Sequence, residues 1–389
     1  MLPIFANKIF KPIFLLIGLS CYCTGHSQIQ NRICDTIPYE IRYNRLIIPV
    51  EVNGIKTRYI IDTGGQTATV ASIAVKVDAQ AQGYAGVSDL NSNKSIFQKG
   101  SLHHIRIGNY TIEKLPSLIL PENPFFEELG VAGIIGCEAF AESVITLDSR
   151  NQILVINSPY RPERLKISDG LPLRSSNSHH PIVEIKLGTR TKEILFDTGV
   201  PEFLLLSTDD CNDLINNGDC RKIAEGNGIV GAGISGLGQP VTLSKVIVPE
   251  LSVMNKTFTT TSSTTSIMGQ TIIGADLLKY GKVIIDFLRK RFYFLPYNPG
   301  STDMQKTTEQ WNIGVLPLDG CFRITTVWNS LYNDVCYGDT VIAIDNHRLD
   351  KTPLSESAIL QIMNLIPGDT AYIVVLKNGI EKKIGIRKE

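Results

Sequence analysis

The sequence predicts a mostly β protein made of two tandem β-barrel lobes related by a pseudo-twofold axis, followed by a small C-terminal β-barrel with a helix. Three observations lead to this fold class: a repeated strand–turn–strand unit, a polar connection between its copies, and a change of pattern after a Pro-Gly-Ser break at 299–301. The 389 residues include 38 basic and 38 acidic side chains. Without net positive charge, no nucleic-acid partner is expected.

The first 27 residues are expected to form a secretory signal peptide. Lys8 and Lys11 precede an apolar run at 13–19 that is too short to span a bilayer. Small residues at Gly25 and Ser27 favour cleavage directly after Ser27. Export to the periplasm or the extracellular space is therefore expected. Lipid anchoring is the less favoured alternative, because neither nearby cysteine has an aliphatic residue three positions before it.

An internal repeat defines the two lobes. Segments 48–64 and 182–199 share the order strand, glycine turn, strand, and each ends in Asp-Thr-Gly. Downstream of each copy, the glycine of an Ile-Ile-Gly run is followed twelve residues later by an aspartate. The repeat predicts an N-terminal lobe at 28–160 and a C-terminal lobe at 161–300.

Two breaks separate these predicted parts. Residues 157–180 are rich in Pro, Ser, Asn and Arg and have little apolar periodicity, which is typical of a connection between lobes. A second break at 296–302 precedes a segment of different pattern. Its strands around one helix predict a separate small domain at 308–389.

The paired Asp-Thr-Gly tripeptides suggest a chemical function. One copy alone is weak evidence, since aspartate and glycine are ordinary turn residues. Two copies on equivalent turns would bring Asp62 and Asp197 together at the axis. Carboxyl groups about 3 Å apart share one proton. Such a pair activates a water molecule with one carboxylate while the other carboxyl donates to a carbonyl oxygen, which is the chemistry of amide hydrolysis.

Residues 40–297 resemble the retropepsin-like and pepsin-like aspartic proteases, in the form that bacteria secrete. The resemblance implies that Asp62 and Asp197 are the catalytic residues. It also implies supporting roles on both lobes. Loop support is implied for Thr63, Gly64, Thr198 and Gly199, the two threonine hydroxyls locking the loops together, and packing beneath the site for Ile135, Gly136, Ile273 and Gly274.

The sequence departs from the family at the position after each tripeptide. Gly65 and Val200 stand where the family usually has serine or alanine, so neither offers a hydroxyl to the aspartates. We therefore expect a pH optimum less acidic than that of the stomach enzymes. The flap tyrosine of the pepsin branch has no clear counterpart, which favours the retropepsin-like branch. The candidate flap residues are Gly83 and Tyr84 in the first lobe and Gly228, Gly231 and Gly233 in the second.

Other residue patterns add no cofactor. The Gly-x-Gly-x-x-Gly match at 226–231 is followed by a strand-like segment instead of a helix, so nucleotide binding is not expected. The histidine pairs at 103–104 and 179–180 lack metal-ligand spacing and are expected to be solvated. We expect no metal and no cofactor. Six cysteines follow the signal peptide, and a disulfide between Cys211 and Cys220 and buried free thiols remain alternatives.

The C-terminal segment resembles the PDZ modules of bacterial processing proteases. The resemblance rests on Gly338-Asp339 before the strand that begins at Val341. It implies that a peptide adds to a sheet edge near Gly314, Val315 and Leu316, with its terminal carboxylate held by backbone amides. The alternative is an unrelated β-rich packing domain.

Together these observations predict an aspartic endopeptidase that acts on peptides or proteins, with the PDZ-like domain positioning chain ends. Both aspartates come from one chain, so a monomer is expected. The alternative is a catalytically silent protein that captures peptides with the cleft and the PDZ-like domain.

Overall fold

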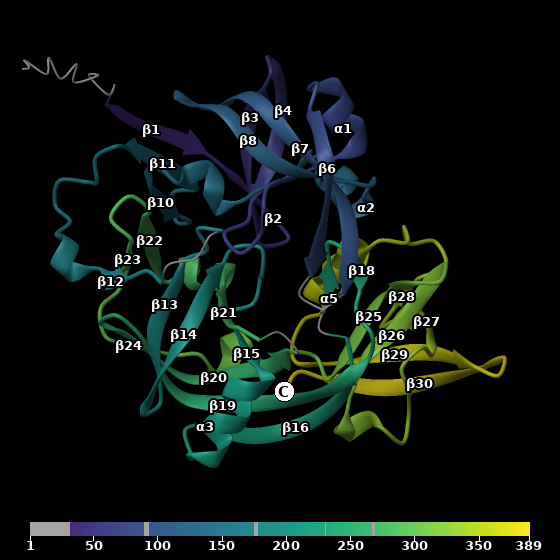
Figure 1. Ribbon diagram of the computed structural model, residues 1–389. Helices are drawn as coiled ribbons and strands as arrows, with labels where there is room; N and C mark the ends of the chain where they lie inside the picture. The colour runs from purple at the N-terminus through teal and green to yellow at the C-terminus, as the bar shows by residue number, and fades with distance from the viewer. Residues whose placement is uncertain (1–31, 89–92, 175–177, 230, 267–268) are drawn as a thin grey trace, which may run out of the picture. The chain divides into compact units, whose positions relative to one another are not determined.

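The computed structural model describes residues 32–88, 93–174, 178–229, 231–266 and 269–389 (Figure 1). The expected signal peptide lies outside these residues. Strands dominate them, so the predicted mostly β, two-lobed fold class is confirmed. Residues 32–389 form one compact unit. Within the described part of the chain, no helix is long and apolar enough to cross a membrane.

The N-terminal lobe is built on an eight-stranded sheet in the order β2-β3-β4-β9-β5-β8-β7-β6. Its first repeat is the β3–β4 hairpin, whose turn residues Asn53 and Gly54 have φ values of 49° and 79°. Two left-handed residues are typical of the tight turn that matches strand twist. The elements are β2 (Glu40–Arg42), β3 (Arg45–Val52), β4 (Ile55–Ile61), β5 (Ala68–Val70), α1 (Ala71–Lys76), β6 (Gln80–Ser88), β7 (Lys94–Ile107), β8 (Tyr110–Leu120), α2 (Pro124–Leu129), β9 (Gly133–Ile135) and the 3-10 helix η1 (Cys137–Phe140).

The C-terminal lobe repeats this pattern. In both lobes the strand that leads to the aspartate pairs in parallel with the strand of the Ile-Ile-Gly run: β4 with β9, and β14 with β21. The elements of this lobe are β13 (Ile182–Leu187), β14 (Arg190–Asp197), β15 (Leu204–Ser207), α3 (Thr208–Asn216), β16 (Arg221–Gly228), β17 (Ala232–Gly233), β18 (Gly236–Leu237), β19 (Val241–Val253), β20 (Lys256–Ser266), β21 (Thr271–Gly274) and η3 (Ala275–Lys279).

A six-stranded sheet joins the lobes in the order β1-β11-β10-β22-β23-β12. The two repeats meet at its centre, where β10 pairs antiparallel with β22 and Val144 lies opposite Asp286. One apolar core runs through both lobes beside this sheet, so the lobes fold against each other. The strands are β1 (Ile33–Pro38), β10 (Val144–Asp148), β11 (Ile153–Ser158), β12 (Leu171–Pro172), β22 (Gly281–Asp286) and β23 (Arg291–Pro296), and η2 (Ile167–Asp169) precedes β12.

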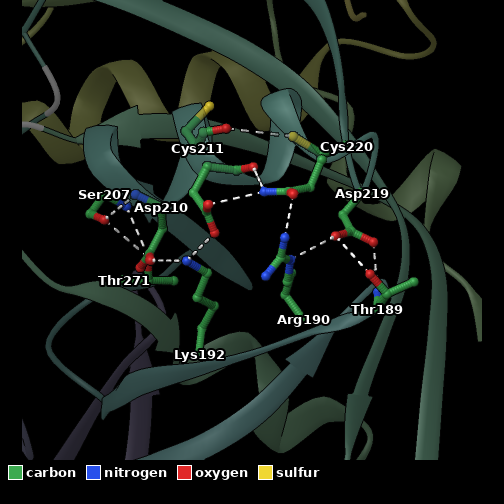
Figure 2. Close-up of polar contacts among 11 residues, drawn as sticks. Thr189, Arg190, Lys192, Ser207, Asp210, Cys211, Asp219, Cys220 and Thr271 are labelled. Atoms are coloured by element: carbon green, nitrogen blue, oxygen red, sulfur yellow. Dashed lines mark hydrogen bonds and ion pairs between the residues drawn. The ribbon is translucent and has the colours of Figure 1, made fainter.

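Polar contacts attach α3 to the C-terminal lobe (Figure 2). Ser207 caps the helix by accepting a hydrogen bond from the amide of Asp210, and Lys192 on β14 forms ion pairs with Asp210 and Asp213 at 3.0 and 2.6 Å. Cys211 and Cys220 lie beside this network and are buried free thiols, so the structure contains no disulfide between them.

The C-terminal domain has its own apolar core but is joined to the C-terminal lobe by a continuous sheet. β16 pairs with β26, so that Gly226 lies opposite Trp328 and Gly228 opposite Thr326. A Cβ atom at Gly228 would lie 2.4 Å from the carbonyl oxygen of Thr325, so only glycine permits this approach. The elements are β24 (Ser301–Asp303), α4 (Gln305–Thr308), β25 (Ile313–Leu318), β26 (Cys321–Trp328), η4 (Asn329–Leu331), β27 (Thr340–Ile344), β28 (His347–Arg348), α5 (Glu356–Leu365), β29 (Thr370–Lys377) and β30 (Ile380–Arg387).

Candidate active site

The two Asp-Thr-Gly turns meet between the lobes, and each glycine lies against the carboxylate of the other lobe. A Cβ atom at Gly64 would be 2.2 Å from Cγ of Asp197, and one at Gly199 would be 2.6 Å from Oδ1 of Asp62. No side chain fits at either position. The glycines therefore allow the two carboxyl groups to lie close enough for a hydrogen bond between them.

A reciprocal network of threonine hydroxyls locks the two turns together. The amide of Thr63 donates to Oγ1 of Thr198 at 3.1 Å, and the amide of Thr198 donates to Oγ1 of Thr63 at 3.0 Å. Each hydroxyl then donates across the axis, Thr63 to the carbonyl of Phe196 and Thr198 to that of Ile61, both at 2.7 Å. Both threonines are buried, so these bonds hold the aspartates in a fixed relation.

The two carboxylates receive equivalent hydrogen bonds but differ in burial. The Gly64 amide donates to Oδ1 of Asp62 at 3.1 Å, and the Gly199 amide donates to Oδ1 of Asp197 at 2.7 Å. Asp197 is only 5% exposed, whereas Asp62 is partly exposed. Burial, followed by the charge of Asp62, raises the pKa of Asp197 well above its usual range. Asp197 is therefore the better site for a proton shared by the pair.

The Ile-Ile-Gly runs lie beneath these turns. Ile135 and Ile273 are fully buried, and they pair with the strands that carry the aspartates. A Cβ atom at Gly136 would be 2.5 Å from the Gly65 carbonyl oxygen, and one at Gly274 would be 2.1 Å from the Glu202 carbonyl oxygen. Both glycines therefore allow the backbone to pass directly under the turns.

Two side chains beside Asp62 were not recognised as site residues from the sequence. Glu138 accepts a hydrogen bond from the amide of Thr67 at 2.5 Å. His180 was expected to be solvated, but it is half-buried and hydrogen-bonded to the Gly65 backbone. Burial lowers the pKa of His180, while the charges of Asp62 and Glu138 oppose this shift. The Glu138 position next to an Ile-Ile-Gly run was a usable sequence signal, but nothing local links His180 to the site.

The flap candidates occupy two different environments. Gly83 and Tyr84 lie on β6 of the β6–β7 hairpin, where Gly83 has φ +101° at a bulge and Tyr84 is 71% exposed. Positions 89–92 of this candidate flap lie outside the described residues. In the second lobe, Gly228 ends β16 against β26, Gly231 follows it, and Gly233 belongs to the short β17–β18 hairpin.

A cavity of about 430 Å³ is lined by residues of both lobes and of the C-terminal domain. The charge of its Arg45 opposes the upward pKa shift of Asp197. Asn44 donates to Oδ1 of Asp276 at 2.9 Å, which links the lobes along its wall. The cavity therefore presents polar side chains beside the aromatic rings of Phe125 and Phe203. Its lining is Tyr43, Asn44, Arg45, Phe125, Pro201, Glu202, Phe203, Leu204, Ser262, Asp276, Thr307, Thr308, Gln310, Leu360 and Asn364.

The candidate peptide groove residues Gly314, Val315 and Leu316 lie on β25. Val315 points into the core of the C-terminal domain, and α5 lies beside this strand. Among the strands of the described residues, β25 pairs only with β26.

Comparison with known proteins finds a family match in the N-terminal lobe. A family model described as aspartyl protease matches residues 48–139, which include Asp62 and the first Ile-Ile-Gly run. Among solved structures, the chain is similar to a retropepsin-like aspartic protease from Rickettsia conorii, with 16% identity and a TM-score of 0.25, over 33% of this chain and 93% of that chain. No curated protein matches the chain. The family match covers less than half of the chain and lies within the first lobe.

Proposed function

We propose that this protein is an aspartic endopeptidase that hydrolyses peptide bonds with a water molecule activated between Asp62 and Asp197. The observation that carries the proposal is the reciprocal bonding of Thr63 and Thr198, which fixes two carboxyl groups face to face at the meeting point of the lobes. A peptide-binding protein without catalysis would not need a buried carboxyl, that of Asp197, held against a second carboxyl.

The proposed reaction depends on the difference in burial between Asp62 and Asp197. The protonated carboxyl of Asp197 donates to the carbonyl oxygen of the scissile bond, while ionised Asp62 takes a proton from water. The water oxygen bonds to the carbonyl carbon, which gives a tetrahedral diol. The proton on Asp62 then passes to the amide nitrogen, the C–N bond breaks, and one diol proton returns to Asp197. Protons balance over the cycle, and no covalent enzyme intermediate forms.

The proposal also gives roles to the N-terminal signal peptide and to the C-terminal domain. A signal peptide at 1–27 would export the enzyme to the periplasm or beyond the cell. Because one chain supplies both aspartates, the enzyme would act as a monomer. The C-terminal domain would act as a PDZ-like module that binds a peptide chain end along the edge of β25 that does not pair with β26, and presents the chain to the cleft.

The test is the loss of hydrolysis when either carboxyl is removed. Asp62→Asn and Asp197→Asn are each expected to reduce peptide cleavage by roughly 10³-fold or more, because neither amide can exchange the shared proton. Asp209→Asn, an exposed aspartate on α3, is the matched control. Cleavage is measured with a peptide library, with and without a statine inhibitor. Only a few-fold loss in either variant would refute the proposed mechanism and favour a role in peptide capture.

A further inference from the structure

His180 reaches the Asp62 turn from the start of the second lobe. It lies directly before Pro181, two residues ahead of β13. The Phe196 amide donates to the Pro181 carbonyl at 3.0 Å, and the Phe196 carbonyl accepts the hydroxyl of Thr63 at 2.7 Å. The backbone beside His180 is therefore tied to the network that fixes the two catalytic turns.

The side chain of His180 contacts the backbone of Gly65. It is half-buried, and its Nε2 atom is shielded from solvent. Its hydrogen bond to the Gly65 backbone raises the pKa of His180, so the ring donates this bond and the Gly65 carbonyl accepts it. A Cβ atom at Gly65 would be 2.7 Å from Oδ2 of Asp62. Gly65 therefore lies between the imidazole and the catalytic carboxylate.

Glu138 adds a third carboxylate to this place. A Cβ atom at Gly136 would be 2.4 Å from Oε2 of Glu138 and 2.5 Å from the Gly65 carbonyl oxygen, so these two oxygen atoms are close neighbours. Oε1 of Glu138 accepts the amide of Thr67 at 2.5 Å, which holds the carboxylate in position. The carbonyl that His180 contacts therefore lies beside a fixed negative charge.

The charge of His180 depends on pH. Within the described residues, the titratable groups that act on it are Asp62 and Glu138 of the N-terminal lobe and the neighbouring His179. Burial has the largest effect and lowers the pKa of His180 below its usual 6.5, whereas both carboxylates oppose this shift. His180 is therefore uncharged at neutral pH and binds a proton as the pH falls. Its positive charge then acts on ionised Asp62.

This charge compensates for a group that Gly65 lacks. Gly65 has no hydroxyl to offer Asp62, and the carboxylate itself occupies the space that a side chain there would need. A protonated imidazole stabilises ionised Asp62 by charge, as a hydroxyl would by hydrogen bonding. It does so only at acidic pH, which is where Asp62 would otherwise begin to bind a proton.

We propose that His180 is a positioning residue of the active site, which binds a proton at acidic pH and keeps Asp62 ionised as the acceptor of the water proton. The proposed reaction stops when Asp62 becomes protonated, so positive charge beside Asp62 extends activity to lower pH. This inference rests on the proposed endopeptidase function and adds to it a residue that determines the acidic limit of activity.

The kinetic test removes the charge and keeps a donor. His180→Gln retains an N–H group for the Gly65 carbonyl but carries no charge. The acidic limb of the pH profile of kcat/KM is expected to move up by about 0.5 pH unit or more, because ionised Asp62 loses a stabilising charge. Above about pH 7.5, wild type and His180→Gln should have equal kcat/KM, since the ring is uncharged there. His179→Gln, at the exposed neighbouring histidine, is the matched control and should keep the wild-type profile.

Two kinetic outcomes would overturn the proposal. An acidic limb that stays in place in His180→Gln would mean that the imidazole charge does not act on Asp62. An equal loss of kcat/KM at every pH would mean that His180 only supports the fold.

A second readout does not depend on catalysis. NMR titration of the imidazole signals gives the pKa of His180, whose signal is assigned by its absence in His180→Gln. Because coupling between two sites is reciprocal, Asp62→Asn is expected to lower the pKa of His180 by about 0.5 or more and to leave that of His179 unchanged. The same pKa of His180 in wild type and Asp62→Asn would refute the inference. If wild type and Asp62→Asn are equally inactive towards peptides, the endopeptidase proposal fails, and this titration still tests whether His180 and Asp62 are coupled.

Discussion

At the scale of single residues, the site requires glycine, which has no Cβ atom, at three positions next to the aspartates. Gly64 and Gly199 lie on the carboxylates of the opposite lobes, and any Cβ atom would displace them. Gly65 is equally constrained, because a Cβ atom there would be 2.7 Å from Oδ2 of Asp62. The departure from serine or alanine at this position therefore has a steric reason in this chain, not only an electrostatic one.

Asp197 provides a prediction about stability and pH. Burial raises its pKa above the usual 3.8, so the folded state holds a proton that the unfolded state releases. Between the usual value and the raised value, the native state binds more protons, and the free energy of unfolding falls as pH rises. This stabilising contribution is complete below the usual pKa and is lost as pH rises through the folded pKa.

Asp197→Asn is therefore expected to flatten this decline and to be more stable than wild type at neutral pH. The measurement is denaturant unfolding from about pH 3 to 8 for wild type, Asp197→Asn and the Asp209→Asn control. A decline of equal slope in wild type and Asp197→Asn would contradict the assignment of the buried proton to Asp197.

At the scale of elements, the internal repeat predicts the strand pairings that occur in both lobes, but not the contacts that are specific to one lobe. The parallel pairing of β4 with β9 and of β14 with β21 follows from two copies of one pattern, since each strand has the same neighbour in sequence and in space. The approach of His180 to Gly65, and of Ile234 to Phe97 and Leu120, could not be predicted. Both contacts join segments distant in sequence.

The β16–β26 pairing could also not be predicted from the sequence, because the polar break at 296–302 indicates a separate domain. Gly228 gives a test of this junction. Gly228→Ala places a methyl group against the Thr325 carbonyl, whereas Gly231→Ala meets no atom within 4 Å. Gly228→Ala is expected to cost about 1–3 kcal/mol, or roughly 2–10 °C in Tm, through overpacking.

Gly231→Ala is the matched control for this junction and is expected to change Tm by less than about 2 °C. Thermal unfolding followed by circular dichroism gives both values. Equal Tm values for the two variants would mean that β16 and β26 do not depend on their close backbone contact.

At the scale of the whole molecule, the C-terminal domain packs against the C-terminal lobe and covers one of its buried side chains. The buried Lys245 of β19 donates to the Glu389 carbonyl at 2.7 Å and lies over the Trp328 ring. Lys245 is only 1% exposed, and this burial lowers its pKa to about 8. The same domain also holds the backbone of Ile229, whose amide donates to the Thr325 carbonyl at 3.0 Å and whose carbonyl accepts from the Thr326 hydroxyl at 3.0 Å.

Removal of residues 302–389 is therefore expected to lower both Tm and peptide cleavage, although the polar break at 296–302 indicates a separable domain. The truncation uncovers the β16 edge and the Lys245 amine, and an unpaired strand edge favours aggregation. Tm and cleavage of both short peptides and proteins should fall together. Leu316→Asp, which changes only the candidate groove on β25, should instead reduce cleavage of protein substrates and spare short peptides. A truncated enzyme with wild-type Tm and peptide activity would show that the domain is a separable module, and that β26 contributes nothing to the lobe beside it.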